Sequence, residues 1–417
     1  MASVIIIGGG IIGLCSAYYL LQQGHQITIL DKSDMLDGCS YGNAGYICPS
    51  HFVPMATPGI VRQGFKWMTN SKSPFYIQPR MSMSLVDWAF KFVKAATKAH
   101  IEASSIPLRD IALLSKKLYE DLIDIPGFDF CYEKKGLLDF FKTEENANHG
   151  KAIVEASKKI GLDAAMLSKH EVQQMEPDIK MDIKGAVYYT CDAHLYPNKL
   201  MKDLIAYLKK HGVDIKAKEE VNNFVLENNK IKGVKTNLSE YFAEHIVLAT
   251  GAWSRQVAAS LRLKIPMVGG RGYSVTLENS PYKINHPIIL SEARVAITPI
   301  GQNKIRFGGT MEITSVNTPP KMNRVKGILE SVKKYFPEFD IPMPSQDKVW
   351  HGYRPCSADG LPYIGKVSKY KNLVVATGHS MLGLSLGAGT GKLVSEIIND
   401  QPLSMNIAPF NPDRFLN

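Results

Sequence analysis

The chain has 417 residues, of which 45% are apolar and 21% are charged. This composition is typical of a globular protein rather than a disordered one, and the length favours two domains over a single core. No stretch approaches the roughly 20 consecutive apolar residues that a membrane-spanning helix needs. The apolar run at 4–7 is broken at once by glycines and has no basic leader, so no signal peptide is expected.

The charge and the cysteines exclude several kinds of site. The formal net charge is +10, yet the lysines are dispersed rather than gathered into runs, so no nucleic-acid partner is expected. The cysteines show neither a C-x-x-C pair nor a regular spacing; they are Cys15, Cys39, Cys48, Cys131, Cys191 and Cys356. We therefore expect reduced thiols in a cytoplasmic protein, without a disulfide framework or a metal site.

The first 31 residues predict a nucleotide-binding turn. Residues 4–7 are typical of a short buried strand, residues 11–23 have the apolar spacing of a helix, and residues 26–30 predict a second strand. Gly8, Gly10 and Gly13 form G-x-G-x-x-G between the first strand and the helix. In that position the glycines allow a tight turn and let a diphosphate approach the helix N-terminus. Asp31 ends the second strand, where its carboxylate can bind ribose hydroxyls.

The stretch 39–59 contains small residues and prolines but few charges. A surface loop of this length is normally more polar. We interpret the composition as backbone that lies against a flat bound ring system, with a simply buried connection as the alternative.

Residues 60–125 are predicted to be mostly helical. One face carries apolar residues and another carries lysines, namely Leu85, Trp88, Phe92, Ala96 and Ala99 against Lys91, Lys94 and Lys98. Such a stripe can dock on anionic lipid. Packing against the rest of the protein is the commoner outcome and is our prediction here.

Shorter elements follow in the middle of the chain. We expect a strand at 136–141, a helix at 144–160, a short capped helix at 167–177, strand character at 185–195 and a helix from Pro197 to His211. Further strands begin near 212 and 221, with a hairpin at Asn228 and Asn229.

Two later strands end in the same way as the first. Residues 245–248 lead into Thr250 and Gly251, and residues 373–377 lead into Gly378, followed by small residues and a helix to 398. Between them, residues 262–345 alternate and predict an antiparallel sheet of a separate domain. We therefore expect a nucleotide domain assembled from the start, middle and end of the chain.

Taken together, these segments resemble the FAD-dependent amino acid oxidoreductases, a family that includes D-amino acid oxidase, glycine oxidase and D-amino acid dehydrogenase. The resemblance covers nearly the whole chain. Besides the glycine motif it rests on residues 40–45, 192–194, 249–254, 271–274, 308–310, 352–355, 359–362 and 378–379. Residues 43–45 and 49–51 are most similar to bacterial D-amino acid dehydrogenases and to relatives that oxidise cis-4-hydroxy-D-proline.

The resemblance implies an α/β fold. It consists of a Rossmann-like FAD-binding domain with a nucleotide site of the glutathione-reductase type, plus an α+β substrate domain with a mixed or antiparallel sheet. The expected FAD-binding domain is discontinuous, comprising 1–59, 165–258 and 346–417. The expected substrate domain comprises 60–164 and 259–345.

The resemblance also implies the cofactor and its contacts. The expected cofactor-binding residues are Gly8, Gly10, Ile11, Ile12, Gly13, Asp31, Lys32, Ser40, Asn43, Ala44, Gly45, Val221, Thr250, Gly251, Trp253, Gly352, Gly378, Gly383, Leu384 and Ser385. Asp31 would bind the ribose, Val221 the adenine, and residues 378–385 the pyrimidine side of the flavin. Gly352 stands where we would look for the cysteine that attaches flavin in sarcosine-oxidising relatives, so non-covalent FAD is expected.

Four residues are candidates for substrate contact or catalysis. By resemblance, Arg354 fixes the substrate carboxylate, and a guanidinium offers a planar two-pronged donor for that task. Tyr273 is a second carboxylate ligand or a core tyrosine. His51 contacts a substrate hydroxyl or amine, and His379 more readily braces a loop over the flavin. For each histidine the alternative is a buried structural role.

The implied reaction is oxidative deamination of a D-amino acid by hydride transfer from Cα to flavin N5. Its product is a 2-oxo acid, or a cyclic imine from a proline-type substrate. The alternatives are oxidation of cis-4-hydroxy-D-proline, oxidation of glycine or sarcosine-type amines and, in another class, action on modified tRNA. The expected partners are an amino acid and, by resemblance to the dehydrogenases, a quinone or other electron-transport acceptor, with peripheral contact at the inner membrane face.

Overall fold

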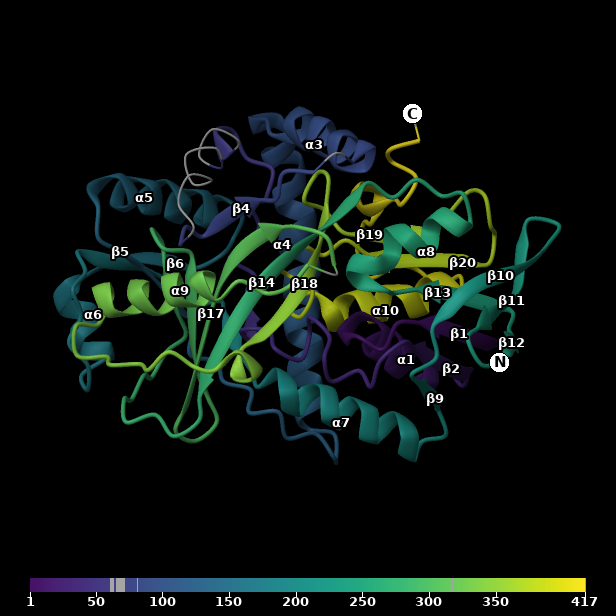
Figure 1. The fold of residues 1–417 in the computed structure, drawn as a ribbon, viewed down its shortest axis with the longest axis horizontal. Coiled ribbons are helices and arrows are strands. Elements are labelled where there is room, and N and C mark those ends of the chain that lie inside the picture. Colours follow the sequence, from purple (N-terminus) through teal and green to yellow (C-terminus); the bar gives the residue numbers. More distant parts are fainter. Residues whose placement is uncertain (61–63, 65–71, 81, 317, 417) are drawn as a thin grey trace.

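The structure is a computed structural model that describes residues 1–60, 64, 72–80, 82–316 and 318–416. Its two large sheets lie side by side (Figure 1). The six-stranded sheet has the order β19-β20-β13-β1-β2-β9, and β19 is its antiparallel member. Its strands are β1 (Ser3–Ile7), β2 (Gln26–Asp31), β9 (Asp214–Ala217), β13 (His245–Leu248), β19 (Tyr363–Lys366) and β20 (Leu373–Thr377). The start, middle and end of the chain thus meet in one sheet, as expected.

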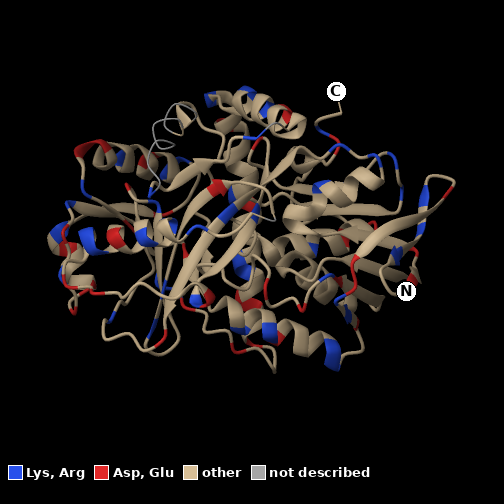
Figure 2. Ribbon diagram, viewed as in Figure 1, with Lys and Arg blue, Asp and Glu red and all other residues tan. Residues whose placement is uncertain are grey.

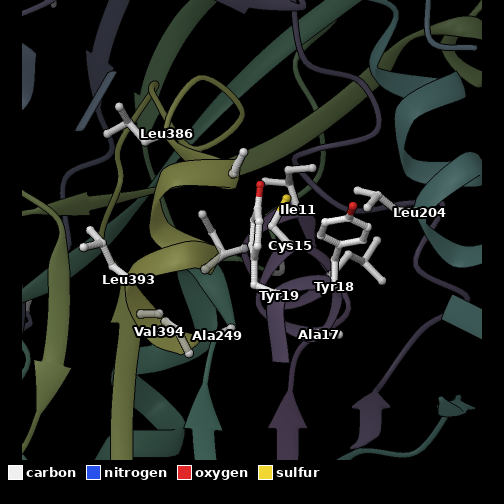
Figure 3. Close-up of a cluster of buried hydrophobic side chains, with 14 of the residues drawn as sticks. Ile11, Cys15, Ala17, Tyr18, Tyr19, Leu204, Ala249, Leu386, Leu393 and Val394 are labelled. Carbon is white, nitrogen blue, oxygen red and sulfur yellow. The ribbon is translucent and has the colours of Figure 1, made fainter. Parts of the chain in front are cut away.

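Alternate residues of β1 supply two different cores, as the twofold period of a strand requires. Val4 and Ile6 pack against the helices α1 (Ile11–Gln22), α4 (Lys98–Ile123), α7 (Pro197–Lys210) and α10 (Gly387–Ile398). Figure 3 shows part of this cluster, where Tyr18 and Tyr19 of α1 lie near Leu204 and Val394. Ile5 and Ile7 face the other core, beneath α8 (Ser254–Ser260) and the small sheet of β10 (Val221–Glu227), β11 (Lys230–Thr236) and β12 (Glu240–Phe242).

The second large sheet has the order β18-β14-β17-β16-β15-β5-β7-β6, and β4 adds to β17. Its strands are β4 (Phe75–Ile77), β5 (Leu137–Phe141), β6 (Ala164–Ser168), β7 (Gly185–Tyr189), β14 (Met267–Leu277), β15 (Ile288–Leu290), β16 (Val295–Ile300), β17 (Lys304–Ile313) and β18 (Trp350–Ser357). The helices α5 (Glu144–Lys159), α6 (Lys169–Met175) and α9 (Met322–Tyr335) cover it. β3 (Tyr46–Ile47) pairs with β8 (Ala193–His194) in a separate two-stranded ladder.

Most expected elements are present, and the exceptions have local causes. The hairpin at Asn228 and Asn229 forms, with positive φ at both residues, and Ser168 and Glu171 make the capping box of α6. The expectation of sheet throughout 262–345 is wrong, because α9 lies within it. Its buried Val325, Ile328 and Val332 have helical spacing. In the sequence this spacing was less evident than the alternation of the strands on either side.

The stretch 60–125 is helical at α3 (Met83–Ala95) and α4, but it also contains the strand β4. Trp88 and Phe92 of α3 are buried and stack with ring centroids 4.9 Å apart, which confirms that this face packs on the protein. Residues 61–63, 65–71 and 81 lie outside the described residues. The division into domains stays a prediction, and β6, β7 and β18 join the nine-stranded sheet although they fall in segments assigned to the FAD-binding domain.

Candidate active site

The turn between β1 and α1 has the close approaches that its glycines predict. Gly8 has φ +108°, and a Cβ there would meet the backbone carbonyl of Ala249 at the end of β13. A Cβ on Gly13 would collide with the carbonyl of Gly8. At Gly10, by contrast, the nearest atom to an added Cβ is Oγ of Ser40, 3.6 Å away. The turn is therefore packed on its inner side and open at Gly10.

The N-cap residue of α1 is Gly10, which makes no side-chain cap of its own. The Ile11 N–H donates to Oγ of Ser40 at 3.1 Å. The N–H groups of Ile12 and Gly13 belong to the first turn and have no acceptor within the helix. Together with the helix dipole, these groups form a site suited to a diphosphate.

The expected adenosine end gathers residues from three segments. Asp31 accepts a hydrogen bond from the Gly9 N–H at 2.6 Å, and its backbone carbonyl accepts one from Glu219 N–H, two residues before Val221. Lys32 places its Nζ over the ring of Trp253, 3.7 Å from the centroid. Asp31, Lys32, Val221 and Trp253 thus lie around one end of the β1–α1 turn, and their contact with adenosine stays a prediction.

The middle and end of the chain are joined beside this turn. Thr250 donates to Oγ of Ser254 at 3.0 Å, and Ser254 is 2.7 Å from the hydroxyl of Thr377 at the end of β20. Thr377 also donates to the carbonyl of Gly251. These hydroxyl bonds fix the two later strand ends against each other.

Residues 40–45 are held by the nine-stranded sheet. Ser274 of β14 donates to the carbonyl of Gly42, and Arg306 of β17 donates to the carbonyl of Asn43 at 2.7 Å. Asn43 also caps its own turn, because its Oδ1 accepts from the N–H of Gly45, with half-buried Ala44 between them. Arg306 was not among the expected residues, since nothing in an alternating strand marks one arginine as a buried anchor.

A tryptophan lies beside the segments that are expected to line the flavin ring. A Cβ on either Gly42 or Gly352 would enter the indole of Trp350, so this flat ring is packed against both glycines. Its Nε1 is buried and has no hydrogen-bond partner among the described residues. Sequence reasoning missed Trp350, although its position two residues before Gly352 on β18 puts both on one face.

Residues 378–385 form a braced loop. Gly378 has φ +78°, and the Ser380 N–H donates to the carbonyl of Pro355. His379 lies 2.9 Å from the Thr390 hydroxyl of α10, and burial lowers the pKa of His379 to about 3. The carbonyl of Leu384 accepts from Tyr119, while Oγ of Ser385 accepts from the Cys48 N–H at 2.8 Å. Gly383, which directly precedes Leu384, is half-buried.

Arg354 projects from β18 across its neighbour strand. Its guanidinium covers Gly272, where a Cβ would collide with it, and its NH1 donates to the carbonyl of Thr310 at 2.6 Å. Its positive charge acts to lower the pKa of the Cys39 thiol, against the larger raising effect of burial. In the described part of the chain no carboxylate lies within 4.0 Å of Arg354, so this half-buried guanidinium has no counter-ion there.

Tyr273 lies in a buried charge network. Its hydroxyl donates to Oε2 of Glu312 at 2.7 Å and accepts from the Lys321 N–H at 2.9 Å. Arg271, which is 0% exposed, donates to the same carboxylate oxygen, and Arg324 lies 3.3 Å from the other. The hydroxyl of Tyr273 thus has both a donor and an acceptor partner within the protein.

His51 lies beside two other polar residues that can bind metals. Ligand atoms of Cys48, His51 and Asp192 lie within 4.8 Å of one another. Burial lowers the pKa of His51 and raises that of Asp192. Hydrogen bonds from Ser50 N–H and Oγ already hold Asp192, which accounts for the cluster without an ion.

The described residues fit an FAD molecule. The open side of Gly10, the N-terminus of α1 and Asp31 suit the diphosphate and adenosine. Along the remaining path, buried polar atoms without partners among the described residues gather at the braced loop and β18, namely Nδ1 of His379, Oγ of Ser380 and Nε1 of Trp350. Such atoms are rare in protein interiors and suit the polar edge of a bound ring.

Comparison with known proteins agrees with this geometry. The chain is 31% identical over 399 residues to a D-amino acid dehydrogenase of Helicobacter pylori, covering 95% of each chain. It is 29% identical over 419 residues to a D-amino-acid oxidase of Bradyrhizobium diazoefficiens, covering 99% of each. Among solved structures, glycine oxidase from Geobacillus kaustophilus superposes with a TM-score of 0.78 at 23% identity, over 100% of this chain and 99% of that one.

A family model matches almost the whole length of the chain. It is described as FAD dependent oxidoreductase and covers residues 3–397, which include both large sheets and every segment of the nucleotide site. The chain therefore belongs to the family of FAD-dependent oxidoreductases.

Proposed function

We propose that this FAD-dependent oxidoreductase dehydrogenates D-amino acids at the Cα–N bond. The observation that carries the proposal is Arg354, a half-buried guanidinium without a counter-ion in the described part of the chain, on the strand that borders the braced loop. Relatives named D-amino acid dehydrogenase and D-amino-acid oxidase support the substrate class.

The reaction removes two electrons and two protons from the amino acid. Bound FAD supplies the acceptor for a hydride from Cα. The amino acid becomes an imino acid, and water then hydrolyses it to a 2-oxo acid and ammonium; a cyclic amino acid gives a cyclic imine instead.

The chain's own contribution is to bind and orient the substrate. Arg354 would hold the substrate carboxylate, because a guanidinium can make two parallel hydrogen bonds to it. The loop 378–385 is held in place by β18, α4 and α10, so it can present backbone N–H groups without reorganisation. Tyr273 would act indirectly, because its hydroxyl positions Glu312 and the backbone of Lys321 through hydrogen bonds.

The main alternative substrates are cyclic or small amines. A glycine oxidase from Bacillus cereus is 25% identical over 97% of this chain with a TM-score of 0.73, which supports glycine or sarcosine-type oxidation as the runner-up. The resemblance of residues 43–45 and 49–51 to relatives that oxidise cis-4-hydroxy-D-proline supports that compound as a substrate.

Anaerobic reduction of the bound flavin tests the proposal. Purified holoenzyme is mixed without oxygen with D-alanine, D-proline, cis-4-hydroxy-D-proline, their L-partners, glycine and sarcosine, and the yellow absorbance is followed. Bleaching by D-compounds is expected. Bleaching by glycine and sarcosine alone would favour the runner-up, and a flavin that none of them reduces would overturn amino acid oxidation.

The electron acceptor is proposed to be a quinone in an anionic lipid membrane. No helix in the described part of the chain has the length and apolarity to cross a bilayer. The outer face of α3, however, exposes Met83, Val86, Phe90 and Val93 by 84%, 61%, 70% and 55%. Their spacing puts them in one stripe.

Lysines lie at the end of this outer face. Lys94 near the end of α3 and Lys98 at the start of α4 are exposed. α3 also carries Asp87, which pairs with Lys91, and both signs of charge are interspersed over the molecule (Figure 2). An exposed apolar stripe with adjacent lysines is typical of a helix that lies in the headgroup region of an anionic bilayer.

A further inference from the structure

Three polar side chains form a hydrogen-bonded row at the edge of the candidate site. Oγ of Ser50 lies 2.5 Å from Oδ2 of Asp192 and 3.1 Å from Nδ1 of His51. The Ser50 N–H also donates to Oδ1 of Asp192, at 3.0 Å. Asp192 is 0% and Ser50 7% exposed, so the row is shielded from water at its carboxylate end.

The direction of these bonds fixes the tautomer of His51. A hydroxyl has one proton to donate, and an ionised carboxylate can only accept. The Ser50 proton therefore points to Asp192, and Ser50 accepts a proton from Nδ1 of His51. Nε2 of His51 then has a free lone pair, and the described residues offer it no hydrogen-bond partner.

The row is tied to the parts of the site that hold FAD and substrate. Cys48, three residues before His51, donates its N–H to Ser385 of the braced loop. At its other end this loop is bonded to β18 next to Arg354, through Ser380 N–H and the carbonyl of Pro355. The segments that carry His51 and Arg354 are thus bonded to opposite ends of the same loop.

The proposed oxidation needs a proton acceptor at such a place. A free amino acid is an ammonium ion at neutral pH, and a hydride leaves Cα readily only when the nitrogen lone pair is available to form the C=N bond. One proton must therefore leave the nitrogen before the hydride leaves Cα.

We propose that Nε2 of His51 takes this proton, with Ser50 and Asp192 as positioning residues. The inference rests on the proposed amino acid oxidation. In the step, one N–H bond of the substrate ammonium breaks and an Nε2–H bond forms, which gives a neutral amine and an imidazolium. The proton leaves to water after the product departs.

Two charged groups, Asp192 and Arg294, act on His51. Asp192 raises the pKa of His51, while burial and the positive charge of Arg294 lower it; Cys48 lies beside Asp192 and stays a thiol because burial raises its pKa. His51 is therefore neutral at pH 7. Removing the charge of Asp192 lowers the pKa of His51 further.

The pH dependence of kcat/KM tests the proposal. If His51 accepts the proton, kcat/KM increases with pH and then reaches a plateau. The midpoint of this increase lies below about pH 6.5, the ordinary pKa of a histidine. Asp192→Asn shifts this rise to lower pH and lowers the plateau about tenfold. His51→Gln lowers kcat/KM about 100-fold, as expected for a lost general base, and removes the plateau.

If Asp192→Asn fails to fold, Ser50→Ala tests the hydrogen-bonded row instead. It removes the bond to Nδ1 and should lower kcat about tenfold with KM nearly unchanged. Ser395→Ala is the matched control, because Ser395 is 2% exposed and bonds the carbonyl of Tyr19 instead. Its kcat should match that of the wild type. All variants should retain flavin.

Two results would overturn the proposal. One is a wild-type kcat/KM that keeps rising tenfold per pH unit up to the pKa of the free substrate's own amine. The other is one tightly bound metal ion per chain whose removal abolishes activity, which would make Cys48, His51 and Asp192 ligands. Either result leaves flavin bleaching by D-amino acids intact, so amino acid oxidation itself is judged separately.

Discussion

Arg354 is the side chain on which substrate recognition is proposed to depend. Arg354→Ala should retain FAD and lose about 3 kcal/mol of transition-state stabilisation, roughly a 100-fold fall in kcat/KM, because a buried partner of the carboxylate is lost. Steady-state kinetics with the best D-amino acid would measure this.

Two further substitutions separate charge from shape. Arg354→Lys keeps the charge without the two-pronged donor and should fall between wild type and alanine. Arg255→Ala removes an exposed arginine of α8 and should leave kcat/KM unchanged. An Arg354→Ala enzyme with wild-type kinetics would exclude this residue from the site.

His379 makes stability depend on pH. Burial holds its pKa at about 3 in the folded protein, against about 6.5 when unfolded. Between these values the unfolded chain binds more protons, so stability is lost as pH falls, by about 2 kcal/mol at pH 5 relative to pH 7.5. In urea unfolding at both pH values, the wild type should lose about 2 kcal/mol more than His379→Gln between pH 7.5 and pH 5.

Glu312 balances two buried arginines. Glu312→Gln leaves Arg271 and Arg324 without that charge and should lower the free energy of unfolding by about 3–5 kcal/mol. Glu240→Gln breaks a comparable but exposed pair with Lys235, for which less than about 1 kcal/mol is expected. Similar losses in urea unfolding for both variants would contradict a structural role for the network.

At the scale of elements, α3 has two apolar faces with different fates. The inner face with Trp88 and Phe92 is buried, and the outer face is exposed. Replacing both Val86 and Phe90 by serine should leave stability and D-amino acid bleaching unchanged. It should weaken binding to anionic vesicles at least tenfold, because roughly 1.5–3 kcal/mol accompanies burial of each apolar side chain.

Co-sedimentation with vesicles measures this binding. Phosphatidylglycerol vesicles should bind the wild type, and pure phosphatidylcholine vesicles should bind it weakly. Phe242→Ser is the control, since Phe242 is 63% exposed but belongs to β12, in the three-stranded sheet and not in α3. If Phe242→Ser weakens binding as much as the α3 variant does, the α3 face is not the contact.

At the scale of the whole molecule, FAD should bind segments from the start, middle and end of the chain at once. A ligand at 100 times its Kd stabilises the folded state by about 2.7 kcal/mol. Gly10→Val points a side chain into the open diphosphate position, where the backbone is extended (φ −73°, ψ 179°). The apoprotein should therefore stay as stable as the wild type, and added FAD should no longer raise its Tm.

Local patterns were enough to predict much of the molecule. The glycines after β1, the alternation in β14 and β17, the Asn-Asn hairpin and the capping box of α6 depend on near neighbours, so the sequence shows them directly. The convergence of three strand ends also followed, because each ends in the same small residues. Arg354 and the FAD contacts came from the resemblance to a family and not from spacing.

The tertiary structure alone decided which polar groups meet. Ser50 and Asp192 are 142 residues apart, Tyr273 and Glu312 are 39 apart, and Arg306 reaches Asn43 across 263 residues. A residue's own neighbours in the sequence carry no record of such distant partners, because hydrogen bonds and ion pairs depend on position in space. For the same reason the sequence did not show which apolar face of α3 is exposed, because that depends on which face the rest of the protein covers.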